Sequence, residues 1–214
     1  MKKSCVIVDY GLGNIFSVAR AVELSGMVPT ISRDQKIVSR AERLILPGVG
    51  AFGSAMQKIR YFGLDNAIFE FLEKGRPFLG ICVGMQVLFN QSSEFGVHKG
   101  LGVLNGTVNL IDFPQSAYDR GLRVPIIGWH KLASNTNAEK TVSELTKNIA
   151  VPDFYFVHSF MATPTGKTVL VKNIDVFNKR ITALVESNNV FGVQFHPERS
   201  AENGQLIFRN FMNL

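Results

Sequence analysis

The sequence has few of the features that hold small secreted proteins together or anchor a chain in a membrane. Only two of its 214 residues are cysteines, Cys5 and Cys82, so we expect no disulfide framework. No apolar run approaches the roughly 20 residues that cross a bilayer, and too few apolar residues precede Asp9 for a signal peptide. These absences predict a cytoplasmic protein in a reducing setting.

The usual signs of a metal, nucleic-acid or dinucleotide site are also missing. The chain has four histidines, at His98, His130, His158 and His196. They do not show zinc-ligand spacing, either among themselves or with the cysteines. The formal charge is +6 and the pI about 9.4, yet the lysines and arginines are scattered along the chain. Gly11 and Gly13 follow an apolar run, but Phe16 stands where a dinucleotide motif has its third glycine. We therefore expect no metal, no cofactor and no nucleic acid.

The first half alternates short apolar runs with helical periodicity. Strands are expected at CVIVD (5–9), ERLILP (42–47) and FLGI (78–81), and amphipathic helices at 15–22 and 64–72. Strands that alternate with helices predict a mostly parallel sheet with helices on both faces, an α/β fold. From about residue 103 the chain is strand-rich, and a last helix is expected over 202–211. We expect a single domain over residues 1–214.

Cys82 stands where one of these strands turns into a predicted helix over 85–89. The order Gly80-x-Cys82-x-Gly84 has the spacing of a nucleophile elbow, in which small neighbours permit a strained turn. Reactive groups gather at the carboxyl ends of strands in a parallel sheet. The free N–H groups at a helix start would favour the thiolate. A buried structural thiol is the alternative.

Two further segments could complete a site for acyl transfer to a thiol. His196 ends an apolar run, and Glu198 follows two residues later. An extended backbone kept straight by Pro197 would let this carboxylate orient the imidazole. Backbone N–H groups for an oxyanion could come from the turn of Gly48, Val49 and Gly50, and from Val83. The alternatives are surface residues beyond a strand and an ordinary glycine turn.

The segments GICVGMQ (80–86), PGVGAFGSAM (47–56) and GVQFHPERS (192–200) together resemble the class I, triad-type glutamine amidotransferases, over nearly the whole chain. The segments DYGLGN (9–14), KGLGVLNG (99–106), GW (128–129) and YFVHSF (155–160) are similar to the glutaminase subunits of imidazole glycerol phosphate synthases, from histidine biosynthesis. This resemblance implies a flavodoxin-like fold, glutamine as substrate and no cofactor. It also implies a heterodimer with a (βα)8-barrel synthase, or cyclase, subunit that receives ammonia.

Carried over by position, Cys82 resembles the nucleophile, His196 the acid/base and Glu198 its orienting carboxylate. The residues that resemble the family's glutamine-binding positions are Gln86, Glu94, His158, Ser159 and Phe160. A zwitterionic amino acid suits a site with a carboxylate for its ammonium group and amides for its polar ends. Without the resemblance, Gln86 would be taken for helix surface and Glu94 for a solvated loop charge.

Two segments depart from the family pattern. The family usually has Pro-His-x-Gly-Trp-Asn at the segment that faces the synthase, whereas residues 125–130 read Pro-Ile-Ile-Gly-Trp-His, and Phe160 replaces the usual tyrosine. An alternative acceptor pathway is therefore amidation of a surface-polysaccharide sugar. A catalytically silent docking subunit is a second alternative. The lone tryptophan, Trp129, is predicted to contact the synthase, with core packing as the other reading.

Overall fold

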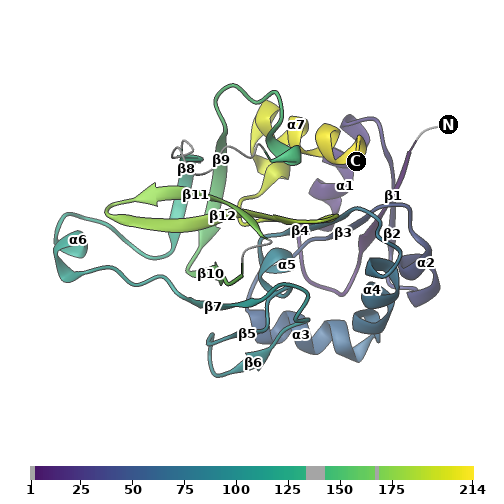
Figure 1. The fold of residues 1–214 in the computed structure, drawn as a ribbon, viewed down its shortest axis with the longest axis horizontal. Coiled ribbons are helices and arrows are strands. Elements are labelled where there is room, and N and C mark those ends of the chain that lie inside the picture. Colours follow the sequence, from purple (N-terminus) through teal and green to yellow (C-terminus); the bar gives the residue numbers. More distant parts are fainter. Residues whose placement is uncertain (1–2, 134–142, 167–168) are drawn as a thin grey trace.

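The computed structural model describes residues 3–133, 143–166 and 169–214, and it has a seven-stranded sheet at its centre (Figure 1). In spatial order the strands are β11 (Leu170–Val176), β12 (Lys179–Ser187), β13 (Val190–Val193), β4 (Phe78–Ile81), β3 (Leu44–Leu46), β1 (Ser4–Val8) and β2 (Val28–Ser32). Neighbours from β13 to β2 are parallel, whereas β12 and β11 add two antiparallel strands. The parallel order β2-β1-β3-β4-β13 is that of flavodoxin-like folds, as expected.

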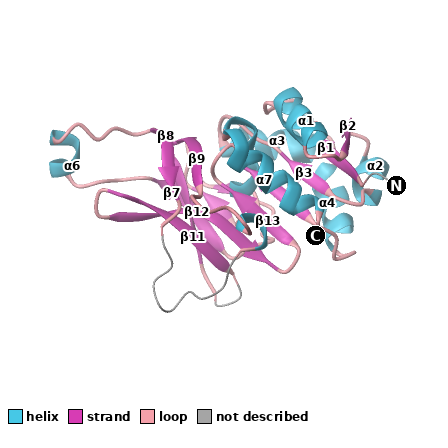
Figure 2. Cartoon of the chain, turned by 90° about the horizontal axis from the view of Figure 1, so that it is seen from above, coloured by secondary structure: helices cyan, strands magenta, loops and turns pink. Residues whose placement is uncertain are grey.

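Helices cover both faces of the parallel strands (Figures 1 and 2). On one face, α1 (Ile15–Leu24) packs against α7 (Ala201–Met212). On the other, α4 (Leu64–Leu72) packs against α2 (Gln35–Arg40) and α3 (Phe52–Tyr61). The predicted apolar stripes of α1 and α4 face the core: Val18, Ala19, Val22, Leu64, Ile68 and Phe71 are buried, and Ile15 and Leu72 are partly buried against them.

A smaller sheet and a two-stranded ribbon lie beside the central sheet. The smaller sheet has the order β10 (Phe160–Pro164), β7 (Gly106–Leu110), β5 (Gln91–Ser92) and β6 (His98–Lys99). The ribbon pairs β8 (Ile126–Lys131) with β9 (Asp153–His158). Between β7 and β8 the chain extends outward to the short helix α6 (Gln115–Asp119), far from the helices of the central sheet (Figure 2). A 3-10 turn, η1 (Glu144–Thr146), precedes β9.

The ribbon is joined to the central sheet through stacked aromatic rings. The ring of Phe154 on β9 stacks on Phe195, just after β13, with ring centroids 4.0 Å apart. Phe156 packs edge-on against the same ring, at 5.6 Å. All three side chains are fully buried. Since β13 and β4 are neighbours, this packing fixes the ribbon next to the carboxyl end of β4, where Cys82 lies.

The helix expected after Cys82 is shorter than predicted. The structure has a single turn there, α5 (Val83–Gln86). The next carbonyl groups are used by a loop instead, because Leu101 N–H donates to the Val87 carbonyl at 2.8 Å and Leu104 N–H to the Leu88 carbonyl at 2.9 Å. The apolar side chains at 87–89 are fully buried in this loop. A short run of buried apolar residues cannot be told from a helix segment by its sequence pattern, which is why a longer helix was predicted.

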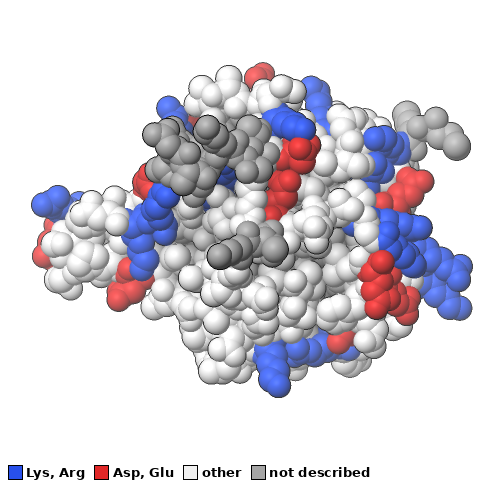
Figure 3. Space-filling view, viewed as in Figure 1, with Lys and Arg blue, Asp and Glu red and all other residues white. Residues whose placement is uncertain are grey.

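Within the described ranges, no helix is both long and apolar enough to cross a bilayer. The same part of the chain holds no group of three or more His, Cys, Asp or Glu side chains that could bind a metal ion. On the face shown in Figure 3, the Lys and Arg side chains lie in separate groups, divided by uncharged and acidic residues. This agrees with the scattered basic residues of the sequence.

Candidate active site

Cys82 forms a sharp turn between β4 and α5. Its φ of 54° and ψ of −112° lie outside the regions that side-chain-bearing residues favour, a conformation that costs about 1–3 kcal/mol. Its N–H donates to the Val193 carbonyl of β13 at 2.7 Å. A Cβ atom on Gly80 would lie 2.5 Å from the Gly84 carbonyl oxygen, and one on Gly84 would lie 1.8 Å from the Leu46 carbonyl oxygen. The two glycines therefore permit close backbone packing on both sides of the thiol.

His196 and Glu198 form a buried pair beside this turn. The imidazole Nδ1 lies 2.8 Å from Glu198 Oε1, and the two side chains are 5% and 1% exposed. Burial favours the neutral ring, but the nearby Cys82 sulfur and the Glu198 carboxylate outweigh it, and the pKa of His196 rises to about 10. The buried Nε2 atom has no hydrogen-bond partner among the described residues. The site therefore favours an imidazolium whose Nε2 proton is free to be donated.

The backbone that brings this pair together differs from the one expected. His196 is extended, but Pro197 begins the 3-10 turn η2 (Pro197–Arg199), so Glu198 does not continue a strand. Proline suits the first position of a helical turn because its φ is already helical and its missing N–H needs no acceptor. The expectation that Pro197 keeps the segment straight is therefore wrong, although the two side chains do meet.

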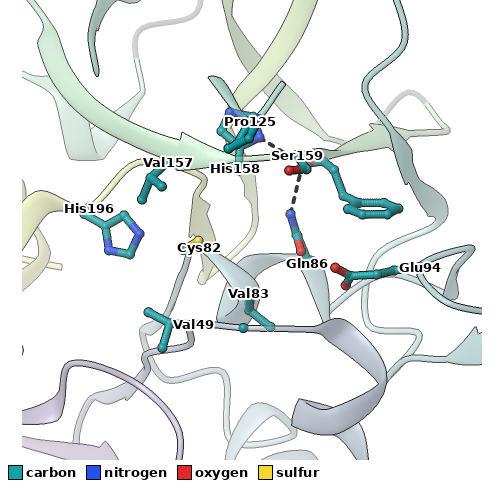
Figure 4. Close-up of a pocket in the computed structure, with 12 residues that line it drawn as sticks. Val49, Cys82, Val83, Gln86, Glu94, Pro125, Val157, His158, Ser159 and His196 are labelled. Atoms are coloured by element: carbon teal, nitrogen blue, oxygen red, sulfur yellow. Dashed lines mark hydrogen bonds between the residues drawn. The ribbon is translucent and has the colours of Figure 1, made fainter. Parts of the chain in front are cut away.

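Most of the predicted site residues line one cavity of about 320 Å³ (Figure 4). Its walls are Val49, Gly50, Cys82, Val83, Gln86, Glu94, Pro125, Val157, His158, Ser159, Phe160 and His196. Glu198 does not line the cavity and lies behind His196. Gly48 is likewise absent from the walls, since it lies against the elbow. Trp129 lies outside the cavity.

Gln86 and Glu94 face the cavity from the side opposite His196 (Figure 4). The Gln86 amide nitrogen donates to the Phe160 carbonyl at 3.1 Å and to Gln194 Oε1 at 3.0 Å, which fixes the side chain. Glu94 Oε2 accepts the Phe52 N–H at the start of α3, at 2.7 Å. This hydrogen bond occupies one carboxylate oxygen, and the other can accept from a bound ammonium group.

His158 belongs to the segment that joins β9 to β10. Its Nδ1 lies 2.9 Å from the Phe160 carbonyl oxygen. Burial lowers the pKa of His158 to about 4, so the ring is neutral at pH 7 and donates from Nδ1. The two histidines of the cavity thus differ in protonation state at pH 7: the raised pKa favours the cation at His196, and the lowered pKa favours the neutral ring at His158.

The turn between β3 and α3 contains two glycines with different roles. Gly50 has a φ of +93°, a conformation that favours glycine, and a Cβ atom there would meet nothing within 4 Å. At Gly48 the φ is ordinary, but a Cβ atom would lie 2.6 Å from the Tyr10 hydroxyl and 2.7 Å from Gly84 N. Glycine at position 50 therefore permits a positive φ, whereas glycine at position 48 permits the turn to pack closely against the elbow.

Sequence reasoning missed Gln194, which contacts the thiol. Its side chain is fully buried, and Nε2 lies 3.6 Å from Cys82 Sγ while Oε1 accepts from Gln86. A signal was present, because Gln194 is a polar residue inside the apolar run VFGVQF (190–195), and buried amides need partners. Pro125 and Val157 were also missed as cavity residues, although they lie in the family segments 125–130 and 155–160.

Trp129 lies on the outer face of the ribbon and is 50% exposed, beside Ile127 at 60%. Its ring packs edge-on against Tyr155 at 6.3 Å, and the Arg199 guanidinium lies over the Tyr155 ring at 4.6 Å. Side chains alternate between the faces of a strand, so these residues point away from the buried rings of Phe154 and Phe156. Core packing of Trp129 is therefore not observed.

A thiol elbow at the end of a parallel strand, with a histidine and a carboxylate beside it, is the arrangement of a triad amidotransferase. Residues 6–214 match the family described as "Glutamine amidotransferase class-I". The chain belongs to the class I glutamine amidotransferases.

Within that family, the chain is similar to proteins named imidazole glycerol phosphate synthase subunit HisH. It is 40% identical to that of Aquifex aeolicus (strain VF5), over 96% of this chain and 94% of the relative. It is also 40% identical to subunit HisH 1 of Legionella pneumophila (strain Lens), over 99% of both chains. These relatives favour the histidine-pathway reading over the surface-sugar alternative.

Solved structures give the same fold. A crystal structure titled as a glutamine amidotransferase has a TM-score of 0.72 and 19% identity, covering 98% of this chain and 99% of that one. PurLQS from Thermotoga maritima gives a TM-score of 0.72 and 24% identity, covering 100% and 99%. The expected class I amidotransferase fold is confirmed.

Proposed function

We propose that this chain is the glutaminase subunit of an imidazole glycerol phosphate synthase. It hydrolyses L-glutamine to glutamate and ammonia. The observation that carries the proposal is the strained Cys82 turn beside the buried His196–Glu198 pair, at one end of a cavity with Glu94 at the other. Intact triad geometry argues against a silent docking subunit, which would not need it.

The first half of the reaction transfers the acyl group to sulfur. The Cys82 thiolate attacks the side-chain amide carbon of glutamine, and the amide oxygen becomes an oxyanion. Val83 N–H is free to bind this oxygen, because the first N–H groups of a helix lack intrahelical acceptors. The turn at Gly48–Gly50 supplies a second donor, the N–H of Val49. His196 Nε2 then gives its proton to the nitrogen, the C–N bond breaks and ammonia leaves.

The second half releases glutamate. His196, now neutral, takes a proton from water through Nε2, and the resulting hydroxide attacks the thioester carbon. The C–S bond breaks and returns the thiolate beside an imidazolium, while glutamic acid loses its proton to solvent. Glu198 holds the imidazole orientation through Nδ1 in both halves.

Ammonia released here passes to a (βα)8-barrel cyclase subunit in a heterodimer, which makes imidazole glycerol phosphate and AICAR for histidine biosynthesis. The likeness to HisH subunits supports this assignment. Residues 1–214 act as one amidotransferase domain in the cytoplasm. Shelter from water matters because solvent would protonate ammonia to ammonium, which is not nucleophilic.

The test compares Cys82→Ala with the matched variant Cys5→Ala, each in complex with the cyclase subunit. We expect Cys82→Ala to lose glutamine hydrolysis by several orders of magnitude, as is typical when a nucleophile is removed, and to keep synthase activity with added ammonium salts. Cys5 is fully buried in β1 and does not line the cavity, so Cys5→Ala should keep both activities. Glutamate release by Cys82→Ala near the parent rate would exclude Cys82 as nucleophile.

A further inference from the structure

Tyr10 places a hydroxyl group at the contact between the turn 47–50 and the elbow. Its side chain follows β1 and is fully buried. A Cβ atom built on Gly48 would lie 2.6 Å from the Tyr10 hydroxyl oxygen and 2.9 Å from Val83 Cβ. The hydroxyl is therefore a close neighbour of both segments that could supply oxyanion donors.

This hydroxyl has no hydrogen-bond partner among the described residues. A buried donor left without an acceptor costs about 1–3 kcal/mol, and phenylalanine would fill the same space without that cost. Burial, reinforced by the neighbouring Cys82 sulfur, raises the pKa of Tyr10 well above its usual value. The hydroxyl therefore keeps its proton and can act as a donor.

The turn offers an acceptor if one peptide unit rotates. Rotating the Gly48–Val49 peptide exchanges the directions of its N–H and carbonyl groups, and the glycines on either side of Val49 make such a rotation easier. Val49 lines the cavity, whereas Tyr10 lies behind the cavity wall. In a trans peptide the N–H and carbonyl groups point in opposite directions, so when the Val49 N–H faces the cavity, the Gly48 carbonyl faces away from it.

We propose that Tyr10 is a positioning residue for glutamine hydrolysis. Its hydroxyl donates to the Gly48 carbonyl oxygen and holds the Gly48–Val49 peptide with its N–H toward the oxyanion. This inference rests on the proposed glutaminase function. The hydroxyl acts through the turn and does not touch the substrate.

The experiment compares Tyr10→Phe with Tyr118→Phe, each measured in complex with the cyclase subunit. Tyr118 lies in α6, far from α5 (Figure 1), and serves as the matched control. One hydrogen bond is worth about 1 kcal/mol, so Tyr10→Phe should lower kcat for glutamine hydrolysis by about 5- to 10-fold. KM should change little, because the Val49 N–H that Tyr10 positions binds the oxyanion and not the amide of bound glutamine.

Thermal unfolding of the isolated subunit separates this role from a structural one. Tyr10→Phe should melt at the parent temperature or above it, since it removes a hydroxyl without a partner. An unchanged kcat, or a lower melting temperature with equal losses in kcat for both variants, would overturn the inference. A parent complex that releases no glutamate would overturn the glutaminase proposal and this inference with it, whereas an active parent matched by Tyr10→Phe would overturn the inference alone.

Discussion

At the scale of single residues, Cys82 holds a backbone conformation that its side chain disfavours. Alanine keeps this strain, because it retains Cβ, whereas glycine relieves it. Cys82→Gly should therefore be more stable than Cys82→Ala by about 1 kcal/mol, after the larger entropy of glycine in the unfolded chain is subtracted. Urea unfolding of the two variants measures the difference.

The order should reverse at Cys5, which lies inside strand β1 and provides the control. Glycine there gains no relief and weakens the strand, so Cys5→Gly should be less stable than Cys5→Ala by about 0.5–1 kcal/mol. If alanine proved the more stable residue at both positions, the strained φ of Cys82 would have no measurable effect on folding.

The His196–Glu198 pair predicts a specific dependence of stability on pH. The folded-state pKa of His196 is raised to about 10 from an ordinary 6.5. A raised histidine pKa stabilises the fold fully below pH 6.5, and that contribution is lost as the pH rises to 10. Glu198→Gln removes the charge of the carboxylate, so the difference in unfolding free energy between parent and variant should shrink between pH 6.5 and 10. A difference in unfolding free energy that stayed constant over this pH range would contradict a charge interaction between His196 and Glu198.

From the sequence, single residues could be placed near one another where a strand end and a short motif coincide. The meeting of Cys82 with His196 follows from β4 and β13 being parallel neighbours, and both strands were visible as apolar runs. The contact of Gln194 with the thiol was not predicted, because it depends on which side of the chain after β13 faces the thiol of Cys82. That orientation follows from the order and pairing of the strands, which local sequence patterns do not give.

At the scale of elements, the sequence predicted those with a strong apolar pattern and missed those without one. Strand β2 was missed because it is an edge strand in which no residue is buried, and it contains Pro29, which edge strands tolerate. The turn η2 was missed because a single 3-10 turn leaves no periodicity. The short length of α5 depends on partners from residues 101–104, far from it in sequence.

The close packing of α7 on η2 gives a prediction about an element. A Cβ atom on Gly204 of α7 would lie 1.8 Å from the Pro197 carbonyl oxygen. Alanine normally stabilises a helix by about 1 kcal/mol relative to glycine, but here it must push η2 away and move Glu198 from His196. Gly204→Ala should therefore lower both the melting temperature and kcat/KM for glutamine.

The exposed helix position Arg209 provides the control for this substitution. Arg209→Ala in the same helix should change the melting temperature and kcat/KM little, since surface substitutions are usually within about 0.5 kcal/mol. A Gly204→Ala variant that was stabilised, with parent kcat/KM, would show that η2 can move without disturbing the pair.

At the scale of the whole molecule, the outer face of the ribbon is the surface on which partner binding can be tested. Ile127 and Trp129 are exposed there, and Trp129 connects through Tyr155 to Arg199, the neighbour of Glu198 in η2. A synthase subunit that covered this face would therefore contact the turn that holds Glu198 against His196. Exposed tryptophans are frequent anchors of protein interfaces.

Trp129→Ala should weaken binding of the cyclase subunit by about 30-fold or more, the loss of an interface anchor worth about 2 kcal/mol. Because the ring is half exposed, the melting temperature of the isolated subunit should change little. Tyr61→Ala supplies the control, since Tyr61 is an 81% exposed aromatic residue at the end of α3, and it should leave the affinity unchanged. Titration calorimetry measures both affinities.

Equal affinities for Trp129→Ala and the parent would show that this face is not part of the interface. A sharp fall in the melting temperature of Trp129→Ala would show that Trp129 stabilises the fold.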